Sequence, residues 1–239
     1  WLENEISNTL YPLNKNFDDD INSEIRAIAF NCLENFGNYP VEKFRDNLKK
    51  ISQESKLQLS KLGIRVGAKY FFIPNLLKKK PLEYRAILWK TFHQKDTEEF
   101  LPLPSNGRVS FSSKIYMPSS YWISIGYINI KNFAFRIDVF EKIFFLARQK
   151  LKKGPFLESS DLMNPIGCNS DQLKDILTFC GYDYLVLSDE KKLYFLTNKK
   201  KEVKKVIKNK YNKKTIKKND KEKNKKDPNS PFAVLEKLL

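Results

Sequence analysis

The chain has 239 residues, 41% hydrophobic and 13% aromatic, with 44 Lys and Arg against 28 Asp and Glu. That composition supplies enough apolar residues for the core of one large domain or two small ones. The longest uncharged segment, 115–130, is too short and too polar to span a bilayer, so we expect no membrane segment. Three cysteines without a CxxC pair and a single histidine exclude a Cys/His zinc site of the usual spacing.

The positive charge is concentrated near the end of the chain. Segment 198–226 holds 15 Lys against three acidic residues, a net charge of +12, whereas the other 210 residues carry only +4. Most of the net positive charge therefore belongs to this tail, and the rest of the chain has nearly equal numbers of basic and acidic residues. The cysteine pattern favours a reducing compartment, and we expect a cytoplasmic protein.

The first predicted elements are helices. Apolar residues from Ile21 to Phe36 share one face, an acidic run at 18–20 precedes them, and Gly37 ends the segment. A second helix is predicted from Pro40 to the glycine at position 63, because apolar residues recur by threes and fours. The two would form a helical hairpin.

The next elements are an extended segment and a third helix. Residues 64–73 are aromatic and β-branched, which predicts extended structure closed by Pro74. Residues 81–93 place apolar side chains on one helical face. Together with the first two helices they form an expected helical accessory subdomain, residues 1–99.

Prolines and serines become frequent between 100 and 120, so we predict a connecting loop there and a boundary between two subdomains. Beyond it, alternation from Trp122 to Ile130 predicts a strand. Helical spacing returns from Arg136 to Leu151. These elements open a second subdomain, residues 121–197.

The rest of the second subdomain follows a recognisable order. A helical turn at 160–164 and a helix at 170–180, with Ser170 as a good N-cap, precede strands at 182–187 and 191–196. Three helices followed by a hairpin are typical of a winged helix. A module that only packs against a neighbouring domain fits about as well, because the third helix exposes Asp171, Gln172, Lys174 and Asp175. The expected fold class is therefore α+β, mainly helical, with a winged-helix-like second half.

Two segments complete the chain. Residues 198–229 have almost no apolar side chains and are predicted to be a disordered basic linker that supplies most nucleic-acid affinity without sequence preference. Residues 230–239 form a short predicted helix with Ser230 at its cap and Phe232 and Leu235 on one face. Since so short a helix is unstable alone, we expect it to dock on a surface.

Catalytic motifs are missing. The eight glycines include no GxxxxGK[ST] or GxGxxG spacing, so we expect no nucleotide cradle of the usual kind. A Ser/His/Asp triad would need His93, which ends an amphipathic helix and is better explained as a surface histidine. We expect no catalytic site, no metal and no small-molecule substrate in this chain.

Several short motifs are similar to those of a known family. They are Leu62-Gly-Ile-Arg-Val-Gly67, Phe71-Phe-Ile-Pro74 followed by Leu76-Leu-Lys78, Arg85-Ala-Ile-Leu-Trp89, Arg136-Ile-Asp138 with Glu141, Leu162-Met163, Gly167-Cys168, Gly181-Tyr182, and Ser230-Pro-Phe-Ala233 with Leu235. Their order resembles the region beyond the ATPase core in bacterial superfamily-two helicases similar to the RNA helicase of the mitochondrial degradosome. One departure is the run Lys78 to Lys80, where family members tend to have a proline soon after LLK.

The resemblance implies the C-terminal accessory region of an ATP-dependent RNA or DNA helicase. Since the chain opens at Trp1, we expect the ATPase core to precede it, and ATP and Mg²⁺ to bind only in that core. The implied partners are a nucleic-acid strand and the helicase's own core. Two alternatives remain open: a free-standing winged-helix nucleic-acid-binding protein, and a protein-interaction module with the terminal peptide as its docking segment.

Candidate strand-contacting residues are basic side chains for phosphates and aromatic ones for base stacking. The candidates are Arg65, Lys69, Lys78, Lys79, Lys80, Arg136, Lys199, Lys200 and Lys201, with Tyr121 and Trp122 for stacking. Each has a structural alternative: Trp122 can be core, Arg65 can hold a buried ion pair, and the lysines at 78–80 can form a solvated loop.

Overall fold

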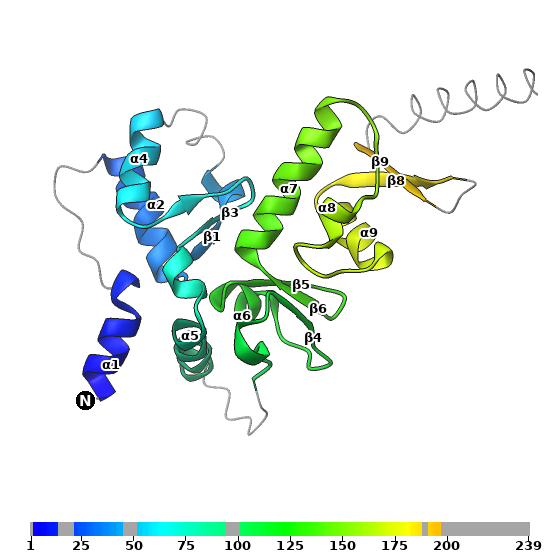
Figure 1. Cartoon of the computed structure of the whole chain (residues 1–239). Helices are drawn as coiled ribbons and strands as arrows, with labels where there is room; N and C mark the ends of the chain where they lie inside the picture. Colours follow the sequence, from blue (N-terminus) through cyan, green and yellow to red (C-terminus); the bar gives the residue numbers. More distant parts are fainter. Residues whose placement is uncertain (1, 14–21, 45–51, 94–100, 188–190, 197–239) are drawn as a thin grey trace, which may run out of the picture.

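The computed structural model describes residues 2–13, 22–44, 52–93, 101–187 and 191–196 (Figure 1). These residues form helices and small antiparallel sheets, which confirms a mixed α+β fold. The described sheets have three strands each, in the orders β1-β3-β2, β4-β6-β5 and β7-β9-β8.

The elements of the first half are α1 (Leu2–Thr9), η1 (Tyr11–Leu13), α2 (Ser23–Glu34), β1 (Asn38–Pro40), η2 (Val41–Phe44), α4 (Gln53–Lys61), β2 (Arg65–Val66), β3 (Tyr70–Phe72), η3 (Pro74–Leu77) and α5 (Lys79–Phe92). Those of the second half are η4 (Ser105–Gly107), β4 (Ser110–Ser112), α6 (Ser119–Ser124), β5 (Tyr127–Ile130), β6 (Phe133–Arg136), α7 (Ile137–Lys152), β7 (Phe156–Leu157), α8 (Ser160–Met163), α9 (Ser170–Phe179), β8 (Tyr182–Val186) and β9 (Lys192–Leu196).

The predicted first helix is α2, and the predicted second helix is wrong at its start. The Asn22 side chain caps α2 by accepting a bond from the Glu24 N–H at 2.9 Å. Pro40 instead lies in β1, opposite Tyr70, and is followed by the 3-10 turn η2. Helix α4 begins only after Ser52, whose hydroxyl accepts from the Ser55 N–H. Pairing with β3 therefore replaces the expected helical hairpin.

The predicted strand from Trp122 to Ile130 is also wrong in its first half. Residues 119–124 form α6, and only Tyr127–Ile130 form β5, after a turn in which Gly126 has a φ of +82°. The sequence did not reveal β6, which pairs with both β5 and β4. Strand β4 lies inside the predicted loop 100–120. Six residues are too few for helical periodicity to be recognised, which explains the error at α6.

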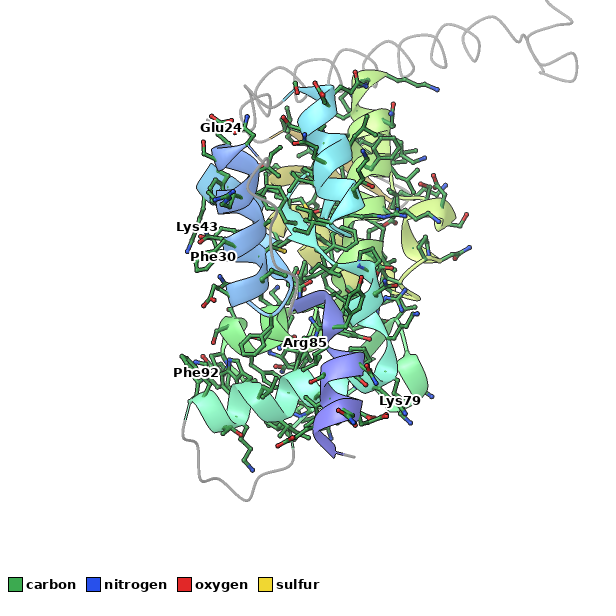
Figure 2. All side chains as sticks on the ribbon, turned by 90° about the vertical axis from the view of Figure 1, so that its left-hand side faces the viewer. Glu24, Phe30, Lys43, Lys79, Arg85 and Phe92 are labelled. Carbon is green, nitrogen blue, oxygen red and sulfur yellow. The ribbon has the colours of Figure 1, made fainter. Side chains whose placement is uncertain are left out.

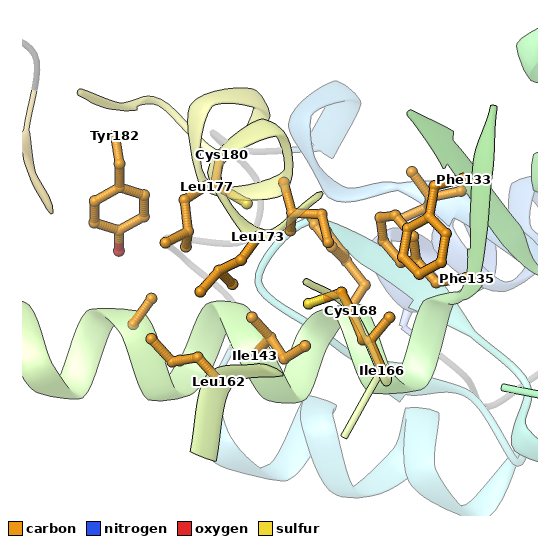
Figure 3. Close-up of a cluster of buried hydrophobic side chains, with 14 of the residues drawn as sticks. Phe133, Phe135, Ile143, Leu162, Ile166, Cys168, Leu173, Leu177, Cys180 and Tyr182 are labelled. Carbon is orange, nitrogen blue, oxygen red and sulfur yellow. The ribbon is translucent and has the colours of Figure 1, made fainter. Parts of the chain in front are cut away.

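Helix α7 is the central element of the second half. In Figure 1 it runs between the sheet of β1 and β3 on one side and α8, α9, β8 and β9 on the other. The cap of α9 is Asn169 rather than Ser170, in a capping box with Gln172. Figure 3 shows α9 directing Leu173 and Leu177 toward Ile143 of α7, with Leu162 of α8 completing the contact. From α7 onward, the predicted helices and the two predicted strands are present, closed by the β8–β9 pair.

Buried side chains cross the predicted boundary at 100–120. One core cluster joins Phe72 and Leu77 to α7 and α9, and another joins Trp89 of α5 to Tyr121 of α6. A third cluster contains only residues up to Leu76 and surrounds α2. The two-subdomain division stays a prediction, but the two halves share core packing.

Arg85 of α5 links the two halves through its guanidinium. It is fully buried and donates to the carbonyl oxygens of Pro81, Phe36, Leu76 and Ile125, at 3.3, 2.9 and 3.1 Å for Pro81, Phe36 and Ile125. Burial lowers the pKa of Arg85 to about 9. One side chain therefore ties together the end of α2, η3, its own helix and the end of α6.

The three cysteines are free thiols inside the protein. Burial raises the pKa of Cys32 to about 12 and that of Cys168 to about 11, so neither thiol ionises readily near neutral pH. No helix in the described ranges is long and apolar enough to cross a membrane. Among the described residues no cluster of three His, Cys, Asp or Glu side chains is placed to hold a metal ion.

Candidate nucleic-acid interface

The turn between β2 and β3 is held against α7 by one carboxylate. Both oxygens of Glu141 accept backbone hydrogen bonds: Oε2 from the Ala68 N–H at 2.6 Å, and Oε1 from the N–H groups of Lys69 and Tyr70 at 2.8 Å each. Burial raises the pKa of Glu141, and the three N–H donors oppose that shift. The contact joins residues more than 70 positions apart in the chain.

Gly67 makes this contact possible. A Cβ at position 67 would lie 2.4 Å from Cδ of Glu141 and 2.6 Å from the carbonyl oxygen of Tyr70. Its own N–H donates to that Tyr70 carbonyl at 2.9 Å, which closes the turn. The second glycine of the motif at 62–67 is therefore explained by the close approach of Glu141.

Two cations meet at one aromatic ring beside this turn. Lys69 Nζ lies 5.4 Å from the ring centroid of Phe144 on α7, and Arg148 Cζ lies 5.9 Å from the same centroid. Within the described part of the chain, neither cation has an ion pair with a carboxylate at 4 Å or less. Two positive charges thus converge on the Phe144 ring, and the carboxylate of Glu141, which lies close to Lys69, is committed to backbone donors.

An exposed ring shares a packing partner with Phe144. Phe144 stacks parallel to Phe140 at 6.3 Å, and Phe179 at the end of α9 packs on Phe140 at 6.1 Å with half its surface (51%) exposed. Phe140 therefore connects Phe179 with Phe144, the ring on which the two cations converge. We call Lys69, Phe144, Arg148 and Phe179 the basic–aromatic face.

Of the predicted phosphate contacts, Lys69 is part of this face, whereas Arg65 and Lys78 to Lys80 are exposed elsewhere. Arg65 lies in β2 and does not form the buried ion pair considered for it. Lys78 is the N-cap of α5, and Lys79 and Lys80 open that helix, with no acidic residue in its first turn. Cations at a helix N-terminus are unfavourable, and Lys80 is paired with Glu5 at 2.8 Å. The predicted solvated loop is therefore a helix start.

Tyr121 and Trp122 are not available for stacking. Their exposed fractions are 0% and 2%, because α6 turns both rings into the core beside Trp89. The Tyr121 hydroxyl donates to the carbonyl of Pro102 at 3.0 Å. The stacking prediction is wrong for both residues, and the core alternative for Trp122 is correct.

Arg136 is occupied by a neighbour. Its Nε and Nη2 donate to the two carboxylate oxygens of Asp138 at 2.7 and 2.8 Å, and these bonds raise the pKa of Arg136. This forked pair spans the start of α7, where the negative charge of Asp138 also interacts favourably with the helix dipole. Arg136 therefore has a structural task that the sequence did not suggest.

Several predicted residues lie outside the described part of the chain: Lys199, Lys200 and Lys201 of the tail, and Phe232 and Leu235 of the terminal segment. Sequence reasoning missed Arg148 and Phe179. The spacing of Phe144 and Arg148 by four on a helix was a usable signal for a cation on a ring. No local signal indicated that Lys69, a candidate chosen for its charge, would lie beside Phe144 and Arg148.

Comparison of the chain with protein-family models, with curated proteins and with solved structures finds no significant match in any of the three. Functional assignment therefore depends on the geometry of the chain itself.

Proposed function

We propose that this chain is a nucleic-acid-binding accessory region that holds a single strand of RNA or DNA across the basic–aromatic face. The convergence of Lys69 and Arg148 on Phe144 is the observation that carries the proposal. Ammonium and guanidinium groups bind phosphates, and the exposed ring of Phe179 offers a surface for a base. Glu141 fixes the backbone of the turn that carries Lys69, so Lys69 starts from a fixed position beside α7.

We also propose a winged-helix relationship for α7 to β9. The element order and the sheet order β7-β9-β8 support it. The outer face of α9, which would enter a groove in such a domain, carries ion pairs: Asp171 with Lys174 and Lys192 at 3.3 and 3.1 Å, and Asp175 with Lys131 at 2.8 Å. Because the acids of α9 hold these cations in ion pairs, this face is poorly suited to phosphate contact. We therefore place the strand on the basic–aromatic face and not on α9.

The motif resemblance supports a place beside a helicase core. Its residues have structural tasks here: Gly67 admits Glu141, Arg85 joins four segments, and Trp89 is 1% exposed. We propose that an ATPase core, binding ATP and Mg²⁺, is the partner, and that this chain guides its strand in the cytoplasm. The Lys-rich segment 198–226 would add affinity without selecting a sequence.

Neutralising the two cations should weaken strand binding strongly. For Lys69→Gln combined with Arg148→Gln, we expect affinity for a labelled 12-nucleotide oligo(U) or oligo(dT) to fall about 25-fold at roughly 0.1 M salt, because each single-strand phosphate contact releases about 0.7 counterion. Fluorescence anisotropy measures this directly.

The matched control is Lys56→Gln combined with Lys114→Gln, which removes the same charge from exposed positions on α4 and after β4. Its affinity should remain within about twofold of wild type. Equal losses in the two double variants would mean that only total charge matters, and the proposed face would be wrong.

A further inference from the structure

A hollow outside the basic–aromatic face lies where α2, β1, η2, α5 and α6 meet. It encloses about 410 Å³, a volume in the range of small-ligand sites. Its lining consists of Glu34, Asn35, Phe36, Tyr39, Pro40, Lys43, Trp89, Phe92, His93, Ser120, Ile123 and Ser124. Five of these side chains are aromatic or imidazole rings, and Ile123 is the one aliphatic chain besides Pro40.

Three rings at the end of α5 contact one another. His93, the single histidine, stacks on Trp89 with centroids 4.2 Å apart and planes 24° apart. Its Nδ1 lies 2.9 Å from the Trp89 carbonyl oxygen and must donate, because a carbonyl oxygen can only accept. Phe92 meets the imidazole edge-on at 5.2 Å and is 76% exposed. A flat group entering the hollow would therefore find an ordered stack to extend.

A cation also lines the hollow. Lys43 is exposed, with its Nζ 5.3 Å from the ring centroid of Tyr39. Figure 2 shows Lys43 and Phe92 on the same edge of the molecule, the first above the second. The hollow thus combines planar stacking surfaces with one cation, Lys43, one carboxylate, Glu34, and the amide group of Asn35.

We propose that this hollow binds one nucleobase of a strand, with the base against the His93 and Phe92 rings and its phosphate near Lys43. The inference rests on the proposed nucleic-acid function and assigns it a second contact point. The aromatic walls offer a base planar faces to stack on, and Lys43 offers its phosphate a cation. Aromatic-lined grooves also bind proline-rich peptides, so a peptide is the alternative occupant that the test must separate.

Proton NMR of the single imidazole tests the proposal in the full chain. Titration with AMP or UMP should move the His93 ring C–H signals upfield, because a stacked base shields them. Phe92→Ala should weaken AMP binding about tenfold, in the range of one base–aromatic stack. Lys43→Gln should reduce the affinity for AMP but leave that for adenosine, which lacks the phosphate, unchanged.

Phe145→Ala is the matched control, because Phe145 is also exposed but lies on α7 outside the hollow, and it should bind AMP like wild type. His93 signals that respond to N-acetylphenylalaninamide and not to AMP would assign the hollow to a protein side chain and overturn the inference. Strand binding by anisotropy with no nucleotide response at His93 would also overturn it, while leaving the basic–aromatic face intact. A chain that neither binds the strand in the anisotropy experiment nor shows a nucleotide response at His93 would reject the proposed function as well.

Discussion

Replacing Glu141 by Ala is expected to lower the free energy of unfolding by about 3 kcal/mol, because the N–H groups of Ala68, Lys69 and Tyr70 lose a charged acceptor at a half-buried site. Each such orphaned donor costs about 1–3 kcal/mol, and solvent reaching the turn reduces the sum. Chemical denaturation in urea measures the change. Lys69 should also lose its fixed position, so strand affinity should fall in the same variant.

Two further variants separate this contact from a general effect of losing a carboxylate. Glu34→Ala, at the exposed end of α2, should change stability by less than about 0.5 kcal/mol. Gly67→Ala should cost about 2 kcal/mol through overpacking, and less when Glu141 is already Ala, because one of the two clashing groups is gone. Strictly additive losses would contradict a direct contact between positions 67 and 141.

Arg85→Met is expected to cost about 3 kcal/mol or more. Hydrogen bonds from a charged donor contribute about 1.5–3 kcal/mol each, and four of them outweigh the several kcal/mol needed to desolvate one cation. The orphaned carbonyls belong to the ends of α2 and α6 and to η3, so both halves should loosen together. Urea denaturation with hydrogen exchange at these segments tests this.

Arg148→Met provides the comparison, since Arg148 is exposed and its loss should leave stability within about 0.5 kcal/mol of wild type. Arg85→Lys keeps the charge but loses the planar fork that reaches several carbonyls, and should remain clearly destabilised. A stable Arg85→Met protein would show that the buried charge is a net cost and that apolar packing alone joins the halves.

Local signals predicted the parts of the fold that local chemistry determines. Helix α2 has a polar cap and an apolar stripe, α9 ends at a glycine with a φ of +92°, and the sequences of β8 and β9 are separated by a short polar run. Each of these features is complete within about 15 residues. The errors came where a short segment was ambiguous, as at α6, or where pairing with a distant strand set the structure, as at β1.

The candidate site was less predictable, because its residues come together only through tertiary contacts. Lys69 was chosen for its charge alone, while its neighbours Phe144 and Arg148 lie more than 70 positions away. Tyr121 and Trp122 were chosen as aromatic residues, yet a single helical turn buries both. Composition identifies residue types suited to nucleic acid, but exposure, which decides whether they can bind it, depends on the assembled fold.

The salt dependence of strand binding tests the central claim most directly. Affinity for oligo(U) should be measured at several salt concentrations for wild type and for Lys69→Gln combined with Arg148→Gln. Each phosphate contact contributes about 0.7 to the slope of log affinity against log salt concentration. If the basic–aromatic face neutralises two phosphates, the slope should be shallower by about 1.4 in the double variant than in wild type. An unchanged slope would contradict the account and place the phosphate contacts elsewhere in the chain.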